Sequence, residues 1–330
     1  MNKNKDQIVK KNIFFDSDEP NGPTIKGYDF DNGIDYDKII DSFATTGAQA
    51  SHLSEAIRII NKMRKEKAFI YLGYTSNLVT SGLRDIFRYL AKNKMIDVIV
   101  TSAGGIEEDI IKCLGDFKLG DFKTSGKELK DKGINRAGNI LIPNSRYCKF
   151  EEFLTPILEK YKDETLTPSE FAHILGKEIN NEKSICFWAN KNNIPVFCPA
   201  ITDGSIGDII YVFKSKNPNF RIDVSEDIVK INNTTFEPNK TGVIILGSGV
   251  VKHHILNANM FRNGANFAVY INSFSEYDAS DSGALPEEAI SWGKLSKNVD
   301  SVKVYGDATI IFPLVVAKTF ALNLNKTKKK

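Results

Sequence analysis

The sequence predicts an α/β protein built on a doubly wound, mostly parallel sheet, Rossmann-like, with a helical N-terminal extension. Six short apolar runs are continuous rather than alternating, as expected for strands that are covered on both faces. Five of them end in small and polar residues, and amphipathic stretches follow, which is the order of elements in a βαβ protein. The runs span 68–73, 98–100, 195–201, 243–246, 267–271 and 302–305.

The two ends of the chain differ from this pattern. The first 27 residues are polar and carry turn signals at 19–23, so we expect a mobile N-terminal segment. Residues 36–64 place apolar side chains near helical spacing, and the break at 45–47 divides them into two expected helices. A basic tail occupies 324–330. Residues 28–323 are interpreted as a single domain.

The stretch 112–193 interrupts the alternation of strands and helices. It contains a long polar connection, and then a helix is expected to begin at Thr167-Pro168 and to run to about Asn180. The stretch is either an excursion from the sheet or a cap over it.

Composition and charge exclude several classes of partner. The 330 residues hold 44 Lys+Arg and 41 Asp+Glu, a formal net charge of +3, which disfavours nucleic acid or an anionic membrane as a partner. No segment approaches the roughly 18 consecutive apolar residues of a membrane span, and the N-terminus lacks the apolar core of a signal peptide. We therefore expect a cytoplasmic protein with reduced cysteines. Adjacent His253 and His254 point in different directions, so no metal site is expected.

The loops that follow the strands predict a nucleotide site. The carboxyl ends of parallel strands converge at one edge of a sheet, where helix N-termini offer free N–H groups to phosphate. The turn at 247–249 has only the first two glycines of a Gly-x-Gly-x-x-Gly motif, and taken alone it is equally well a tight turn without a ligand. Several such loops after successive strands favour a dinucleotide.

An acidic segment near the C-terminus predicts a site for a cation. It holds Asp278, Asp281, Glu287 and Glu288 shortly before Trp292. On composition alone a solvated loop and helix start is the commoner explanation, because Pro-Glu-Glu is an ordinary first helical turn. Carboxylates beside an aromatic face also suit an aliphatic amine.

Two lysines are candidate nucleophiles. Lys294 follows Trp292 and Gly293, and a desolvated lysine can attack a carbonyl or imine as a neutral amine, although most lysines are simply solvated. Lys252, beside His253, is a rival on the same grounds. His253 is either a structural histidine or a group that transfers protons.

Asp203 and Asp208 follow the run at 195–201. They either cap a helix or contact the ligand, and their place at the carboxyl end of a strand favours the ligand.

At these residues the chain resembles the deoxyhypusine synthase family, and the resemblance extends from about residue 27 to residue 321. The segments that carry it are 73–85, 101–115, 133–139, 142–153, 175–181, 202–208, 249–265, 280–294 and 304–314.

This resemblance implies an NAD-dependent transfer of the 4-aminobutyl group of spermidine to one lysine of the precursor of translation initiation factor 5A. In the family a hydride passes from spermidine to NAD, 1,3-diaminopropane leaves, and the butyl fragment is held as an imine on the lysine that corresponds to Lys294. The fragment then passes to the factor and is reduced. The resemblance also implies a homotetramer with active sites at dimer interfaces, and an N-terminal segment that can cover a neighbouring entrance.

The resemblance assigns roles to individual residues. It makes Lys294 and His253 catalytic, and it implies no metal ligands. The implied spermidine contacts are Glu107, Glu108, Asp208, His253, Ala279, Ser280, Asp281, Glu288 and Trp292. The implied NAD contacts are Ser76, Asn77, Leu78, Val79, Thr80, Ser102, Ala103, Gly104, Glu108, Asp203, Gly247, Ser248, Ser273, Asp307 and Ala308.

A few positions depart from the family pattern, and two other functions stay open. Ser248 and Ala279 replace glycines, Ser102 replaces a threonine, and Ser273-Phe274 replaces a smaller pair, so Phe274 is not expected to make the same cofactor contact as in the family. Homospermidine synthase, which uses putrescine as acceptor, is the main alternative. A catalytically silent paralogue that activates another subunit is the second, although Lys294 is retained here.

Overall fold

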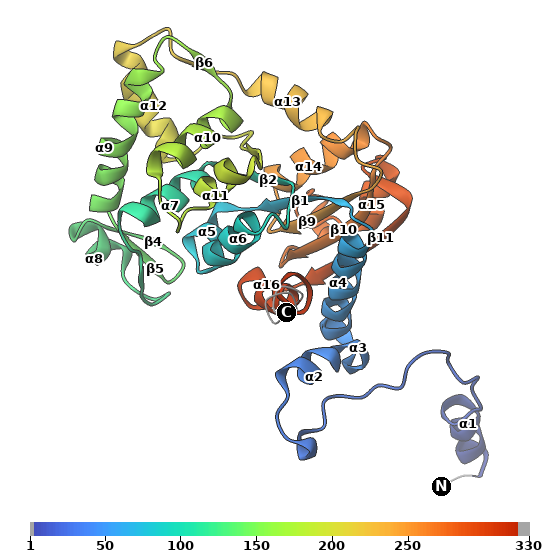
Figure 1. The fold of residues 1–330 in the computed structure, drawn as a ribbon. Coiled ribbons are helices and arrows are strands. Elements are labelled where there is room, and N and C mark those ends of the chain that lie inside the picture. Colours follow the sequence, from blue (N-terminus) through green and yellow to red (C-terminus); the bar gives the residue numbers. More distant parts are fainter. Residues whose placement is uncertain (1–2, 323–330) are drawn as a thin grey trace.

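The computed structural model describes residues 3–322 (Figure 1). Within these residues a main sheet of six parallel strands has the order β11-β10-β9-β1-β2-β7. Its strands are β1 (Phe69–Tyr74), β2 (Val98–Thr101), β7 (Val196–Phe197), β9 (Thr241–Leu246), β10 (Ala265–Asn272) and β11 (Leu295–Tyr305). The chain runs outward from β1 to β2 and β7, then returns to the other side of β1 at β9. The predicted doubly wound sheet is confirmed, with its switch of direction between β1 and β9.

Helices cover both faces of the sheet, which explains the continuous apolar runs. In β9, Val243 and Ile245 belong to one buried cluster and Ile244 and Leu246 to another, as the alternation of side chains along a strand requires. The first face is covered by α13 (Val224–Asn233), α14 (Val250–Met260) and α15 (Pro286–Ser291). The second is covered by α4 (Ala48–Lys65), α6 (Leu83–Lys92), α7 (Ala103–Leu114), α10 (Pro168–Ile179), α11 (Ile185–Asn192) and α16 (Ala308–Val316).

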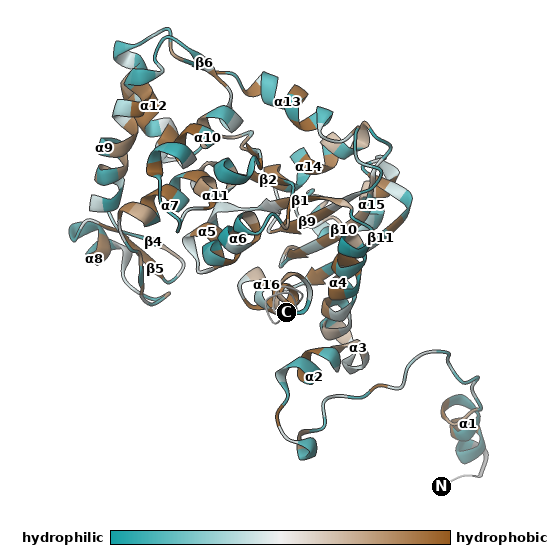
Figure 2. Cartoon of the chain, viewed as in Figure 1, coloured by the Kyte–Doolittle hydropathy of each residue, from teal (hydrophilic) through white to brown (hydrophobic). Residues whose placement is uncertain are grey.

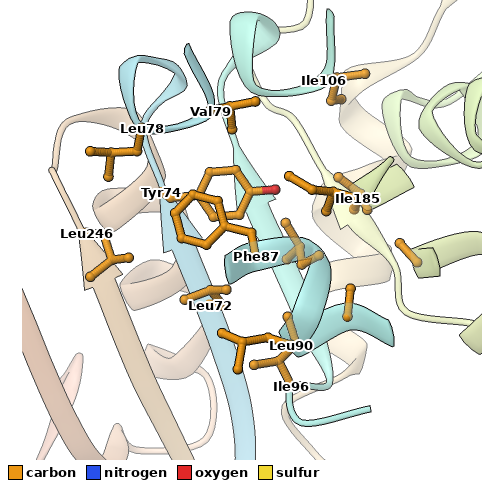
Figure 3. Packing of buried hydrophobic residues seen from close by; sticks show 14 of the residues in the cluster. Leu72, Tyr74, Leu78, Val79, Phe87, Leu90, Ile96, Ile106, Ile185 and Leu246 are labelled. Atoms are coloured by element: carbon orange, nitrogen blue, oxygen red, sulfur yellow. The ribbon is translucent and has the colours of Figure 1, made fainter. Parts of the chain in front are cut away.

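The second face holds the larger core. Hydrophobic residues colour the central strands in Figure 2, while hydrophilic ones are concentrated on the outer helices. The rings of Tyr74, at the end of β1, and Phe87, on α6, stack with centroids 4.1 Å apart (Figure 3). This packing fixes β1 against α6 directly beside the loop that begins at the carboxyl end of β1.

Smaller elements complete the fold. The other helices are α1 (Lys3–Ile13), α2 (Tyr36–Asp41), α3 (Phe43–Thr46), α5 (Ser76–Thr80), α8 (Gly126–Asp131), α9 (Ser145–Lys160) and α12 (Ser205–Lys216), with short turns at η1 (Phe30–Asn32), η2 (Glu276–Asp278) and η3 (Ala317–Ala321). The antiparallel strands β3 (Lys118–Leu119), β5 (Ile140–Pro143) and β4 (Ile134–Ala137) form one small sheet, and β6 (Thr165–Leu166) pairs with β8 (Arg221–Ile222).

The stretch 112–193 is an excursion between β2 and β7. The helix expected at Thr167 is present as α10, and the Thr167 side chain caps it reciprocally with Glu170. The stretch before it is not the long polar connection that we expected. It contains the small sheet and the 16-residue helix α9, whose buried side chains include Phe150 and Leu154.

Three other expectations differ from the structure. The run 195–201 yields only the two residues of β7, because Pro199 has no N–H for a strand ladder. The run 302–305 is the end of a longer strand, β11, whose polar residues suit the edge of a sheet. The stretch 36–64 forms three helices rather than two, with turns at Ser42 and at Gly47, which has φ +89°.

The N-terminal segment contains a helix that the sequence did not suggest. α1 lies apart from the body of the protein at the end of an extended segment (Figure 1). The basic tail at 324–330 lies outside the described residues. Among residues 3–322, no helix is long and apolar enough to cross a membrane.

Candidate active site

The loops at the switch point form one cavity. It has a volume of about 420 Å³ and lies at the carboxyl ends of β1, β9 and β10. Seven residues assigned to NAD line it: Asn77, Leu78, Gly247, Ser248, Ser273, Asp307 and Ala308. Gly247 and Gly249 have φ of +77° and +65°, a left-handed conformation that favours glycine. The tight turn predicted after β9 therefore forms part of a ligand-sized hollow.

Several of the other residues assigned to NAD lie on α5 and at the start of α7, next to this cavity. α5 carries Ser76, Val79 and Thr80, and α7 begins with Ala103 and Gly104 directly after Ser102. The Ser76 amide donates to the Ser102 hydroxyl over 3.2 Å. A Cβ at Gly104 would lie 2.6 Å from the Ser76 Cβ, so only glycine allows α5 and α7 to approach this closely. Asp203 is exposed after β7, with its side chain outside the cavity walls.

These residues suit a dinucleotide. Three helices, α7, α14 and α16, begin at this edge of the sheet, and their free N–H groups favour phosphate. The Ser248 hydroxyl is buried and has no hydrogen-bond partner within residues 3–322. A bound molecule with polar groups can satisfy it.

A second cavity, of about 160 Å³, surrounds Lys294. Five residues assigned to spermidine, His253, Ala279, Asp281, Glu288 and Trp292, line it together with Lys252. Lys294 is only 9% exposed, and its Nζ lies 5.7 Å from the centre of the Trp292 ring. The structure therefore places a largely desolvated lysine beside two carboxylates and an aromatic face, which is the arrangement expected for an amine substrate.

Lys252, the rival nucleophile, is engaged in the structure. It is 1% exposed, and its ammonium donates to the backbone carbonyls of Asp281 and Ala284. Burial lowers the pKa of Lys252 to about 8. These hydrogen bonds give Lys252 a structural use at the site and favour Lys294 as the candidate nucleophile.

Three residues assigned to spermidine lie elsewhere. Glu107 is buried on α7 and accepts a hydrogen bond from the Ile206 amide. Glu108 accepts from the Thr80 hydroxyl, and burial raises the pKa of Glu108 to about 7. Asp208 lines a separate cavity between α9 and α12. Within the described chain, the candidate substrate residues thus form two groups, one around α15 and one around α7 and α12 (Figure 1).

The remaining positions have local roles. Ser280 donates to the Asp278 carboxylate over 2.7 Å and lies in the loop that borders both cavities. Ala279 has φ +60°, the conformation of the glycine expected there, and the exposed Phe274 side chain also lines the first cavity. Residues 3–322 contain no cluster of three or more His, Cys, Asp or Glu that could hold a metal ion.

Sequence reasoning missed Lys303. The residue is 6% exposed, and its ammonium contacts the loop after β10. The available signal was a lysine inside the otherwise apolar run 302–305.

The chain is similar to known proteins in sequence and in structure. Residues 38–319 match the sequence model of the deoxyhypusine synthase family. The chain is 52% identical to a deoxyhypusine synthase of Senecio vernalis, over 90% of this chain and 89% of that protein. It is also 48% identical to homospermidine synthase 2 of the same plant, over 99% and 98%. A solved structure from Entamoeba histolytica, described as a candidate deoxyhypusine synthase, superposes with a TM-score of 0.65 and 36% identity over 90% of this chain and 97% of that chain.

Proposed function

The chain belongs to the deoxyhypusine synthase family of aminobutyltransferases, and we propose that Lys294 carries the aminobutyl group of spermidine on its way to a lysine of the precursor of translation initiation factor 5A. The observation that supports this proposal is the cavity in which Lys294 meets Asp281, Glu288 and Trp292. Residues 28–323 would form the catalytic domain. A protein substrate that acts in translation would place the enzyme in the cytoplasm.

The chain's own residues bind and position the polyamine. Asp281 and Glu288 would hold the ammonium groups of spermidine, and Trp292 would lie along its alkyl chain. NAD, held by the residues around the switch point, would accept a hydride from spermidine and return it at the end of the reaction. The result of the first transfer is an imine between the butyl carbon and the nitrogen of the propyl arm.

Lys294 then exchanges one imine for another. Its neutral amine adds to the imine carbon, the bond from that carbon to the propyl nitrogen breaks, and 1,3-diaminopropane leaves. His253, which is exposed at the cavity and paired with Asn257 over 3.0 Å, would carry the proton to the leaving nitrogen. Attack by the acceptor lysine reverses the exchange and frees Lys294.

The separation of the substrate residues into two groups supports an active site shared between copies. The protein would be a homotetramer. In it, Lys294 of one copy would face the acidic residues Asp208, Glu107 and Glu108 of another. Mixing the variants Lys294→Ala and Asp208→Asn tests this arrangement, because a shared site regains activity in mixed assemblies. A mixture as inactive as each variant alone would contradict it.

Homospermidine synthase is a second candidate, because the chain is 48% identical to one over nearly its full length. The acceptor distinguishes the two functions. The protein is incubated with NAD and spermidine, together with either the factor precursor or putrescine. Deoxyhypusine on the precursor supports the proposal, whereas a product formed only with putrescine contradicts it.

A further inference from the structure

The loop at 273–285 separates the two cavities. It joins β10 to α15. Ser273 and Ser282 line the cavity assigned to NAD, whereas Ala279 and Asp281 line the cavity around Lys294. The shape of this loop therefore sets how far a substrate beside Lys294 lies from the cofactor.

Lys303 joins the two ends of this loop. Its Nζ donates to the carbonyl of Phe274 over 2.6 Å and to the carbonyl of Gly283 over 2.5 Å. The two arms of the loop touch at the same place, because a Cβ at Gly283 would lie 1.6 Å from the carbonyl oxygen of Ser275. Gly283 thus allows the arms to close, and the ammonium of Lys303 bridges them.

Burying the charge of Lys303 costs free energy, so the residue is an unfavourable choice if it only stabilises the fold. The residue is 6% exposed in β11 between Val302 and Val304. Among the described residues it forms no salt bridge, and the charge of Glu276 acts on it only from a distance. Side chains alternate between the two faces along a strand, so Lys303 lies on the sheet face opposite that of Val302 and Val304. A buried charge without an ion-pair partner costs free energy that an apolar side chain of similar length would avoid. The two carbonyls that it binds belong to the loop and to no other element.

We propose that Lys303 is a positioning residue, which holds loop 273–285 in the shape that sets the substrate beside Lys294 at the correct distance from the cofactor. Lys303 lines neither cavity, so it acts through the loop and not on the reactants. Lys252 supports the same loop from α14 through the carbonyls of Asp281 and Ala284. The inference rests on the proposed function.

Lys303→Met tests the proposal, because methionine keeps the length of the side chain and removes its donors. We expect backbone amides of 273–285 to exchange with deuterium about tenfold faster in the ligand-free variant, while β10 and β11 exchange as before. We also expect a larger deuterium isotope effect on kcat with spermidine deuterated at the carbon that loses the hydride. Lys303→Arg, which keeps donors and charge, should restore part of both properties.

Lys62→Met is the matched control. Lys62 also reaches β11, through Asp300 over 3.0 Å, but it does not contact the loop. This variant should leave exchange of 273–285 and the isotope effect unchanged.

Two results would overturn the proposal: exchange and isotope effect unchanged in Lys303→Met, or faster exchange spread evenly over the sheet. If Lys303→Met does not fold, hydrogen exchange in Lys303→Arg and in the native protein tests the proposal instead. Fast exchange of the Gly283 amide in the ligand-free native protein would contradict a loop held in place by Lys303. Failure of the proposed function appears differently, as a native enzyme that does not consume spermidine.

Discussion

The carboxylate of Glu107, on α7, accepts a hydrogen bond from the Ile206 amide at the start of α12 over 2.9 Å. Gly204 precedes this helix and offers no side-chain cap. A Cβ at Gly204 would lie 2.8 Å from the Glu107 carboxylate oxygens, so the glycine lets the acid approach. Glu107 therefore caps a helix that carries Asp208, and it connects the two elements of that half of the candidate site.

Replacing Glu107 should destabilise this half of the site. Glu107→Ala leaves the first amides of α12 without their acceptor, and we expect a loss of about 1–3 kcal/mol in the free energy of unfolding. Glu107→Gln keeps an acceptor oxygen and should lose less. Urea titration of both variants measures the difference. An equal loss of unfolding free energy in the two would show that the side-chain oxygen at position 107 does not stabilise α12.

Spermidine binding should depend on pH through Glu108. Burial raises the pKa of Glu108 to about 7, against the opposing effect of the Thr80 hydroxyl. The carboxyl is protonated below this pH and attracts an ammonium group only above it. The KM for spermidine should therefore decrease as the pH is raised from 6 to 8. Glu108→Gln should have a higher KM with a flatter pH profile. A variant that keeps the native profile would contradict the assignment.

The same shift predicts a change in stability. The ordinary value of 4.5 is the pKa in the unfolded chain, so the folded protein binds the Glu108 proton more tightly. This carboxyl therefore favours folding at low pH, and its contribution to the free energy of unfolding is lost as the pH rises from about 4.5 to 7. Unfolding of Glu108→Gln across this range serves as the control for the kinetic experiment.

Gly104→Ala should weaken the binding of NAD. The new methyl group would lie 2.6 Å from Ser76 Cβ and push α5 from α7, an overpacking that costs about 1–3 kcal/mol. Gly126→Ala is a matched control, because nothing lies within 4 Å of a Cβ at that helical glycine. Calorimetric titration with NAD should show weaker binding only for the first variant. Equal affinities would place the cofactor away from this contact.

Arg84 should be important for stability and not for chemistry. It is buried with Asp109, which accepts from Arg84 Nε over 2.8 Å and from the amides of Ile185 and Cys186, each over 3.0 Å. Arg84→Met leaves an unpaired buried carboxylate, so we expect a loss of about 3–5 kcal/mol. The surface pair of exposed Lys240 and half-buried Glu66 should contribute less than about 1 kcal/mol. Chemical denaturation of Arg84→Met and of Lys240→Met compares the loss of unfolding free energy on breaking the buried pair with the loss on breaking the surface pair.

Local sequence predicted the elements whose signal is local. The apolar runs of β1 and β9, the proline at the start of α10 and the glycines of the turn at 247–249 each determine structure within a few residues. Motif resemblance predicted the family. Those signals were sufficient for the sheet and for the residues that surround Lys294.

The remaining features depend on contacts between distant segments. Glu107 meets Ile206 across 99 positions of the chain, and Lys303 meets Gly283 through a carbonyl group that carries no sequence signal. The edge strand β11 is polar for much of its length, so its start could not be predicted from an apolar run. Long-range hydrogen bonds to the backbone explain why these roles were missed.

Reductive trapping shows whether Lys294 carries the aminobutyl group. The protein is incubated with NAD and spermidine without an acceptor, borohydride is added, and the peptides are analysed by mass spectrometry. We predict a reduced aminobutyl adduct on Lys294, and its loss together with the activity in Lys294→Ala. An adduct on Lys252, or full activity in Lys294→Ala, would contradict the role of Lys294 as the nucleophile.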